Sequence, residues 1–344
     1  MSDYLDFATP QELRVRGTVI VVPGRGETSA TYRRFGARIA SDSYTVRALA
    51  SPVVTTSARD ALASLDAALS AALASLEADL TKPLILVGTD TGATTLAASV
   101  ARGAASGSTD LPAWWPDALV LASLPGYGSQ EVDSDWAAEL DVRSHCPVHR
   151  GVLADDAAFT RGALSTAVDD ELLDLAYGST ADIPQLLLVG DSDPLADRQA
   201  ITRLAKVLPS ARLSVVRDAH HDVLNDLQHR SVAAEVVSFL EVVRGGRPLT
   251  SIVGAELSSW LGREGLRGGD RRASARQDPP RKGILTCYFI WVLRHPAIGI
   301  PIRAAVAAIE TGVAFQLLHI RPSPECGTPA PRSTAAWSTF PMTR

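Results

Sequence analysis

The chain has 344 residues with a net charge of −5, and 46% of its residues are hydrophobic. This apolar fraction excludes wholesale disorder and a collagen-like repeat. Three cysteines are too few for a disulfide scaffold, and a mildly acidic chain lacks the basic surface that neutralises nucleic-acid phosphates. Because the first residues lack the basic and apolar regions of a signal peptide, we expect a cytoplasmic protein that binds no nucleic acid.

The charge changes sign along the chain. Residues 1–261 have a net charge of −12, whereas residues 262–344 have a net charge of +7. A run rich in glycine and arginine, Gly262–Gly269, lies at this change and marks a boundary. We therefore predict one folded domain over residues 1–261, followed by a basic tail over residues 262–344 that is disordered or non-native.

The tail contains one apolar run, residues 283–293, which has 11 residues. A membrane span requires about 18, so we do not expect a membrane anchor, and a short amphipathic or partner-binding segment is the alternative for this run. With 30 Arg and 3 Lys, the chain is typical of a GC-rich genome. Out-of-frame reading of such DNA gives Arg-, Pro- and Gly-rich sequence, and a frameshift is therefore our preferred explanation of the tail.

Short apolar runs alternate with helical patterns along residues 1–261. The runs are residues 18–22, 44–49, 84–87, 118–121, 185–189 and 212–216. Leucines at steps of three and four predict a helix over residues 60–80, and similar patterns follow Gly92 and occupy residues 196–208 and 231–243. This alternation predicts an α/β protein with a mostly parallel, doubly wound sheet, which binds ligands at the carboxyl ends of its strands.

The first and third runs are each followed by glycines. Residues 23–27 read Pro-Gly-Arg-Gly-Glu, which is neither a Walker A loop nor GxGxxG and by itself fits a plain glycine turn. Residues 88–92 read Gly-Thr-Asp-Thr-Gly and are followed by a helical pattern. A strand, a G-x-nucleophile-x-G turn and a helix form a nucleophile elbow, with Asp90 at its centre. The alternative for Asp90 is an ordinary helix N-cap.

The fifth and sixth runs are followed by an acid and a histidine. Asp193 lies in Gly190–Leu195, which by itself fits a turn, and His221 lies in a segment that contains two adjacent histidines. Asp90, Asp193 and His221 thus follow predicted strands in the order nucleophile, acid, histidine, which is the order of the α/β-hydrolases.

These motifs together resemble the α/β-hydrolase superfamily, in particular its lysophospholipase and monoacylglycerol-lipase members and small actinobacterial members. Residues 23–27 resemble the H-G-x-G-E oxyanion loop, with Pro23 where histidine is usual. The segment with the acid resembles G-x-x-D-P-L, and residues 221–226 resemble H-E-x-L-N-E, which selects His221 over His220. The resemblance implies the α/β-hydrolase fold with a short lid insertion over residues 125–183.

Asp90 stands where this family has serine. An ionised aspartate suits an electrophilic sp3 carbon, as in the related epoxide hydrolases and haloalkane dehalogenases, and the attack gives an ester on the enzyme. The resemblance implies that water activated by His221, which Asp193 orients, hydrolyses this ester. It also implies an oxyanion hole made by the backbone N–H groups of Arg25 and Thr91. The expected partner is a small apolar substrate.

Two alternatives remain open at this point. In a lipase-like hydrolase of carboxylic esters, Asp90 would be a base or polar anchor and not the nucleophile. The missing serine and Pro23 also suit a non-catalytic ligand-binding protein on the same scaffold.

The lid segment contains several aromatic side chains. The resemblance makes Tyr127, Trp136 and Tyr177 candidate substrate contacts, although packing of the lid on the core is the more ordinary role of such residues. His145 and His149 flank a proline and have no matching second cluster of ligands, so we expect neither a metal site nor a cofactor. The sequence leaves the oligomeric state open.

Overall fold

The computed structural model describes residues 4–50, 57–76, 80–127, 132 and 135–249. The predictions made for the tail, residues 262–344, therefore lie outside the described residues.

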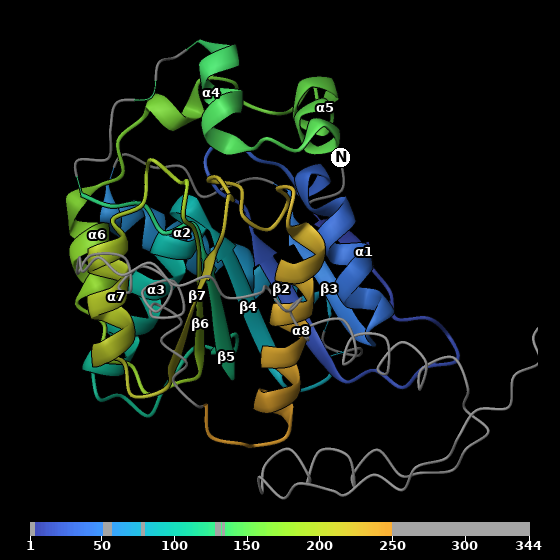
Figure 1. Ribbon diagram of the computed structural model, residues 1–344. Coiled ribbons are helices and arrows are strands. Elements are labelled where there is room, and N and C mark those ends of the chain that lie inside the picture. Colours follow the sequence, from blue (N-terminus) through green and yellow to red (C-terminus); the bar gives the residue numbers. More distant parts are fainter. Residues whose placement is uncertain (1–3, 51–56, 77–79, 128–131, 133–134, 250–344) are drawn as a thin grey trace, which may run out of the picture. The chain divides into compact units, whose positions relative to one another are not determined.

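A seven-stranded sheet forms the centre of the described part, in the order β1-β3-β2-β4-β5-β6-β7 (Figure 1). Its strands are β1 (Tyr4–Phe7), β2 (Gly17–Val22), β3 (Tyr44–Leu49), β4 (Leu84–Thr89), β5 (Ala118–Ala122), β6 (Gln185–Gly190) and β7 (Ala211–Val216). Strands β2 to β7 pair in parallel, and only β1 is antiparallel to its neighbour. All six predicted strands are present, and the predicted, mostly parallel sheet is confirmed.

Helices follow the strands. They are α1 (Arg33–Ser41), α2 (Ala58–Ala74), α3 (Asp90–Ala105), α4 (Trp136–Arg143), α5 (Pro147–Asp155), α6 (Asp170–Tyr177), α7 (Arg198–Val207) and α8 (His229–Arg244), with 3-10 turns η1 (Ser29–Tyr32) and η2 (Ala163–Ser165).

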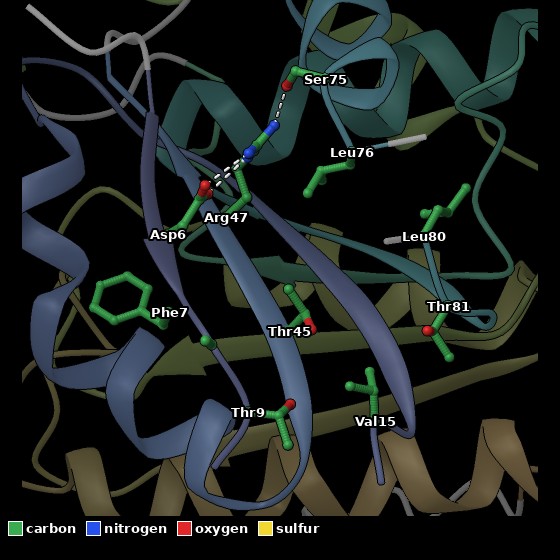
Figure 2. Close-up of a pocket in the computed structure, with 11 residues that line it drawn as sticks. Asp6, Phe7, Thr9, Val15, Thr45, Arg47, Ser75, Leu76, Leu80 and Thr81 are labelled. Atoms are coloured by element: carbon green, nitrogen blue, oxygen red, sulfur yellow. Dashed lines mark hydrogen bonds and ion pairs between the residues drawn. The ribbon is translucent and has the colours of Figure 1, made fainter. Parts of the chain in front are cut away.

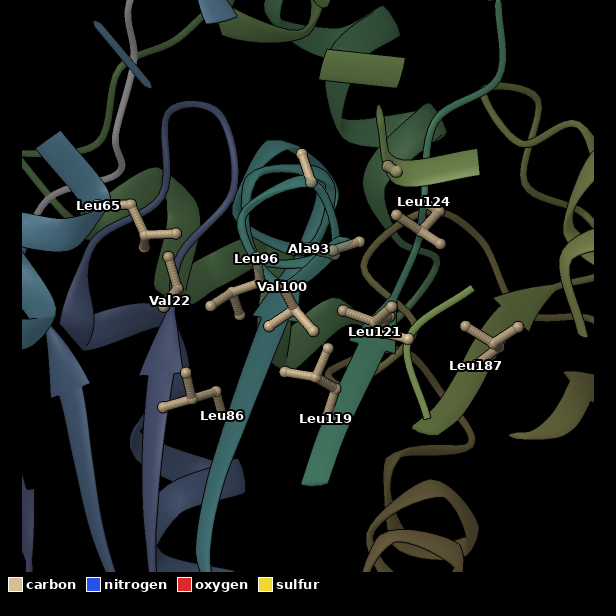
Figure 3. Close-up of a cluster of buried hydrophobic side chains, with 14 of the residues drawn as sticks. Val22, Leu65, Leu86, Ala93, Leu96, Val100, Leu119, Leu121, Leu124 and Leu187 are labelled. Atoms are coloured by element: carbon tan, nitrogen blue, oxygen red, sulfur yellow. The ribbon is translucent and has the colours of Figure 1, made fainter. Parts of the chain in front are cut away.

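Side chains of each central strand alternate between two hydrophobic cores. Along β4, Leu84 and Leu86 enter a core with α2, α3, α6 and α7 (Figure 3), whereas Ile85 and Val87 enter a core with α1 and α8. Because successive strand residues point to opposite faces, a run that is apolar at every position is buried on both sides. Helices on both faces follow from this pattern.

Three elements differ from the expectation. Helix α2 ends at Ala74 and not near residue 80, because the hydroxyl of Ser75 and the guanidinium of Arg47 both donate to the carbonyl of Ala72 in its last turn. Strand β1 was not predicted, since it is a short and half-exposed edge strand. Helix α1 was not predicted either, because few of its residues are apolar, and it buries mainly Phe35 and Ile39.

The lid segment has two parts. Helices α4 and α5 lie at one end of the sheet (Figure 1), where the loop after β7 contacts them, whereas α6 packs along α3 at the side of the sheet. Among the described residues, no helix combines the length and the apolar character that crossing a membrane requires.

A cavity of about 510 Å³ lies near the amino ends of β2 and β4, away from the strand ends where ligands are expected (Figure 2). Arg47 lines this cavity, but its Nε and Nη2 atoms each lie 2.7 Å from one carboxylate oxygen of Asp6. Its cation is therefore already paired.

Candidate active site

The turn from β4 to α3 has the geometry of a nucleophile elbow. Asp90 adopts a left-handed backbone conformation with φ of +48°, which is strained for a residue with a side chain. Gly88 and Gly92 make the turn possible, because a Cβ at Gly88 would lie 2.6 Å from the backbone nitrogen of Ala93 and one at Gly92 would overlap the carbonyl oxygen of Pro23. The side chain of Asp90 does not cap helix α3, so the N-cap alternative is wrong.

The structure brings together the three predicted side chains at the ends of β4, β6 and β7. Nδ1 of His221 lies 3.0 and 3.1 Å from the two carboxylate oxygens of Asp193. Nε2 of His221 lies 3.4 Å from Oδ1 of Asp90 and forms no hydrogen bond within the described part of the chain. All three side chains are buried. The imidazole thus stands between two carboxylates, held firmly by Asp193 and loosely by Asp90.

Arg25 makes an additional contact that the sequence did not indicate. Its Nε and Nη2 each lie 2.8 Å from one oxygen of the Asp90 carboxylate, a bidentate pair with 3% of each side chain exposed. Its Nη1 donates to the carbonyls of Leu164 and Thr166 in the lid segment. The guanidinium therefore connects the elbow to the lid, and both carboxylate oxygens of Asp90 are engaged.

For the expected oxyanion hole, the structure gives a contact of the Arg25 N–H, and the part of Thr91 stays a prediction. The backbone N–H of Arg25 donates to Oδ2 of Asp90 over 2.9 Å, so it points at the position where charge would develop. Thr91 lies in the first turn of α3, and its side-chain oxygen has no hydrogen-bond partner among the described residues.

The charges at this centre alternate. Burial alone would raise the pKa of Asp90, but the charge and hydrogen bonds of the Arg25 guanidinium, together with the nearby His221 imidazole, hold it well below its usual range. Burial alone would lower the pKa of His221, but Asp193 and then Asp90 raise it from 6.5 to about 10. Basic and acidic side chains therefore alternate along the row Arg25, Asp90, His221 and Asp193.

A buried glutamate supports the oxyanion loop. Oε2 of Glu27 accepts the backbone N–H of Gly24 over 2.6 Å, the Thr89 hydroxyl over 2.8 Å and the Tyr32 hydroxyl. Burial and the charge of Asp222 raise the pKa of Glu27. Through these hydrogen bonds, the Glu27 carboxylate joins the loop after β2 to the end of β4. In the sequence, only the place of Glu27 at the end of the Pro-Gly-Arg-Gly-Glu motif pointed to this residue.

The histidines near the lid have other partners. Nε2 of His149 lies 2.7 Å from Oδ2 of Asp222, and Nδ1 of His220 lies 2.9 Å from Oδ2 of Asp226. The ring of His145 lies against that of His220, with centroids 3.7 Å apart. Within the described residues, no group of three or more His, Cys, Asp or Glu side chains could hold a metal ion.

The three candidate substrate contacts in the lid have partners of their own. The hydroxyl of Tyr127, which is 45% exposed, donates to Asp174, and that of Tyr177 donates to the carbonyl of Pro125. Trp136 packs against Phe159, with ring centroids 5.5 Å apart. The structure therefore shows contacts within the described residues for all three, and their role toward a substrate stays a prediction.

No protein-family model matches this sequence, and no curated protein matches it. Solved structures do. The monoacylglycerol lipase of Paleococcus ferrophilus matches with a TM-score of 0.53 and 20% identity, over 70% of this chain and 98% of its own. A monoglyceride lipase variant from Saccharomyces cerevisiae matches with a TM-score of 0.54 and 14% identity, over 72% and 92%. A carboxyl esterase of Bacillus coagulans matches with a TM-score of 0.50 and 15% identity, over 70% and 94%.

The chain has the α/β-hydrolase fold. The fold prediction is confirmed. At such low identities the likeness shows the fold alone, so the chemistry of this α/β-hydrolase fold protein has to be argued from its side chains.

Proposed function

We propose that the chain is a hydrolase of a small apolar substrate, acting in the cytoplasm, with Asp90 as its nucleophile. One observation carries the proposal: an ionised carboxylate stands on a positive-φ elbow, 3.4 Å from the imidazole of a histidine that a second carboxylate orients. Elbow, acid and histidine come from three different strand ends, and a shared position at the carboxyl edge of the sheet is where this fold carries out its chemistry.

In the first step, Oδ1 of Asp90 forms a bond to an sp3 carbon, and the bond from that carbon to its leaving group breaks. Nη2 of Arg25 has to release Oδ1 for this attack, whereas Nε and the backbone N–H can stay on Oδ2. A halide leaves with the electron pair as an anion. An epoxide oxygen needs a proton, which the His221 imidazolium can supply, since its pKa is raised to about 10 by Asp193 and Asp90 against the effect of burial.

In the second step, water hydrolyses the ester. Once Asp90 is esterified, its negative charge no longer supports the imidazolium, so the pKa of His221 falls and the neutral imidazole can accept a proton from water. The hydroxide attacks Cγ of Asp90, and the negative charge develops on Oδ2, where the Arg25 N–H and guanidinium already point. Collapse releases the alcohol and restores the carboxylate.

Trapping of the ester tests this proposal. The His221→Gln variant lacks the base for the second step, so incubation with haloalkanes, whose halide leaves without a proton, should add the mass of the alkyl group to the Asp90 peptide. His220→Gln is a matched control, because His220 pairs with Asp226 and not with Asp193. In wild type, repeated turnover in H2(18)O should place the label in the Asp90 carboxylate. The absence of adduct and label in a chain that does turn over these substrates would exclude a nucleophilic Asp90.

Two further functions belong in the same test. The neighbouring structures are named as lipases and an esterase, so an ester hydrolase with a non-nucleophilic Asp90 is the second candidate. The Arg25 pair, which occupies both oxygens of Asp90, favours a non-catalytic ligand-binding protein as the third. Hydrolysis of short p-nitrophenyl esters that depends on His221 and gives no Asp90 label supports the second candidate. The absence of turnover with all three substrate classes supports the third.

A further inference from the structure

Lid helix α4 ends on the two loops that form the candidate active site. The backbone N–H of His221 donates to the carbonyl of Val142 over 3.1 Å, and that of Asp222 donates to the carbonyl of Arg143 over 2.7 Å. Carbonyls in the last turn of a helix have no partner within the helix. The histidine loop therefore caps the lid helix, and its backbone position depends on the lid.

The side chain of Arg143, which is 1% exposed, extends this connection to the oxyanion loop. Its Nη2 donates to the carbonyl of Arg25 over 2.6 Å and to Oε1 of Glu139 over 2.9 Å. Its Nη1 lies 3.3 Å from Oδ1 of Asp222, next to His221 in the sequence. One guanidinium therefore contacts the lid, the oxyanion loop and the histidine loop.

The lid makes further contacts on the same loop. The N–H of Thr160 donates to the carbonyl of Gly26 over 3.0 Å, and within the lid the second carboxylate oxygen of Glu139 accepts the N–H of Gly162, two residues after Thr160. Gly26 has φ of +76°, and a Cβ there would overlap the carbonyl oxygen of Thr160. The residue that follows Arg25 is thus in close contact with the lid.

We infer that Arg143 is a positioning residue: it fixes the Arg25 carbonyl and the histidine loop together, so that the Arg25 N–H and the His221 imidazole meet at Asp90. This inference rests on the proposed function for its effect on turnover, and on geometry alone for its effect on His221. Lysine cannot replace arginine here, because three acceptors on three segments need the planar fork and not a single ammonium group.

Variants have to respect the buried charges around Arg143. Glu139 and Asp222 form ion pairs with Arg143, and Glu27 and Asp90 interact with its charge over a longer distance. Removal of Arg143 alone would leave buried carboxylates without a partner and would destabilise the fold. The double variant Arg143→Met with Glu139→Gln removes a cation and an anion together, and the glutamine amide oxygen can still accept the Gly162 N–H. Arg143→Lys keeps the charge in place.

Both variants should keep the fold and lose the positioning. We expect kcat to fall by about 100-fold with little change in KM, since small displacements of catalytic groups have effects of this size. The low-field Nδ1–H proton signal of His221 in NMR spectra should broaden, because a loosened histidine loop exchanges this proton faster. Arg150→Met is the matched control: Arg150 is in the same lid but pairs on the surface with Asp141, and its variant should match wild type in both measurements.

Folded variants with wild-type kcat and an unchanged His221 signal would overturn the inference. The NMR measurement does not depend on turnover. If wild type hydrolyses none of the substrates but the His221 signal broadens only in the Arg143 variants, the proposed function fails and the positioning role stands. If wild type is active and the Arg143 variants equal it, the positioning role fails and the proposed function stands.

Discussion

Loss of one partner of the Arg25–Asp90 pair should be among the most destabilising single changes in this protein. Both side chains are 3% exposed, and the guanidinium makes two bonds of 2.8 Å to the carboxylate. Arg25→Met leaves the carboxylate buried with only the Arg25 N–H and the more distant His221. Loss of one partner of such a buried pair costs about 3–5 kcal/mol in the free energy of unfolding, against about 5–15 kcal/mol for a whole domain.

Urea unfolding at pH 7 measures this loss in the free energy of unfolding, and two controls separate the effect of the buried charge from that of losing any ion pair. Arg16→Met removes a surface pair with Glu241, in which 46% of the Arg16 side chain is exposed, and should cost less than about 1 kcal/mol. The double variant Arg25→Met with Asp90→Asn removes both buried charges and should recover much of the loss, giving a coupling energy in the cycle of four proteins. An Arg25→Met loss no larger than that of Arg16→Met would refute our account of the centre.

Two further predictions concern pH and backbone geometry. The pKa of His221 is raised from 6.5 to about 10 by Asp193 and Asp90, against the effect of burial. The stabilisation that the imidazolium gives is therefore complete below pH 6.5 and is lost between pH 6.5 and 10, by at most about 1.4 kcal/mol per pH unit. His221→Gln should flatten this alkaline decline of the free energy of unfolding measured in urea, and an equal decline in wild type and variant would contradict the pairing. Gly92→Ala should destabilise the protein by about 1–3 kcal/mol, because the new Cβ overlaps the Pro23 carbonyl. Gly151→Ala is the control: it lies within helix α5, has no atom within 4 Å of the new Cβ, and should stabilise the protein by about 0.5–1 kcal/mol. Equal Tm shifts in the two variants would count against the tight elbow.

The sequence predicted the parallel sheet because its strands are buried on both faces. A run such as Leu84–Val87 has no polar position, and this alone indicates helices on either side. Strand β1 is an exception, since an edge strand covers one neighbour only and needs few apolar residues. The end of helix α2 was missed because Arg47, from strand β3, donates to the carbonyl of Ala72 in its last turn, which the local sequence does not indicate.

At the site, residues placed by a local motif were predictable and residues placed by a distant contact were not. Asp90, Asp193 and His221 each follow an apolar run within five residues, so the topology brings them to one edge. The ion pair of Arg25 with Asp90 joins positions 65 residues apart, and a motif that assigns Arg25 a backbone role says nothing of its side chain. Arg143 lies in a lid segment with no motif at all, and only its burial and its contacts in the structure show its importance.

The capping of helix α4 by the histidine loop has a consequence for engineering. Lids of this fold invite exchange between proteins, as a means of changing which molecules reach the site. In this chain, a transplanted lid would have to supply acceptors for the N–H groups of His221 and Asp222 and a donor for the Arg25 carbonyl. In a chimera that exchanges the lid alone, His221 would be displaced, because its loop would lose these hydrogen bonds. The exchangeable unit is therefore the lid together with the loops after β2 and β7.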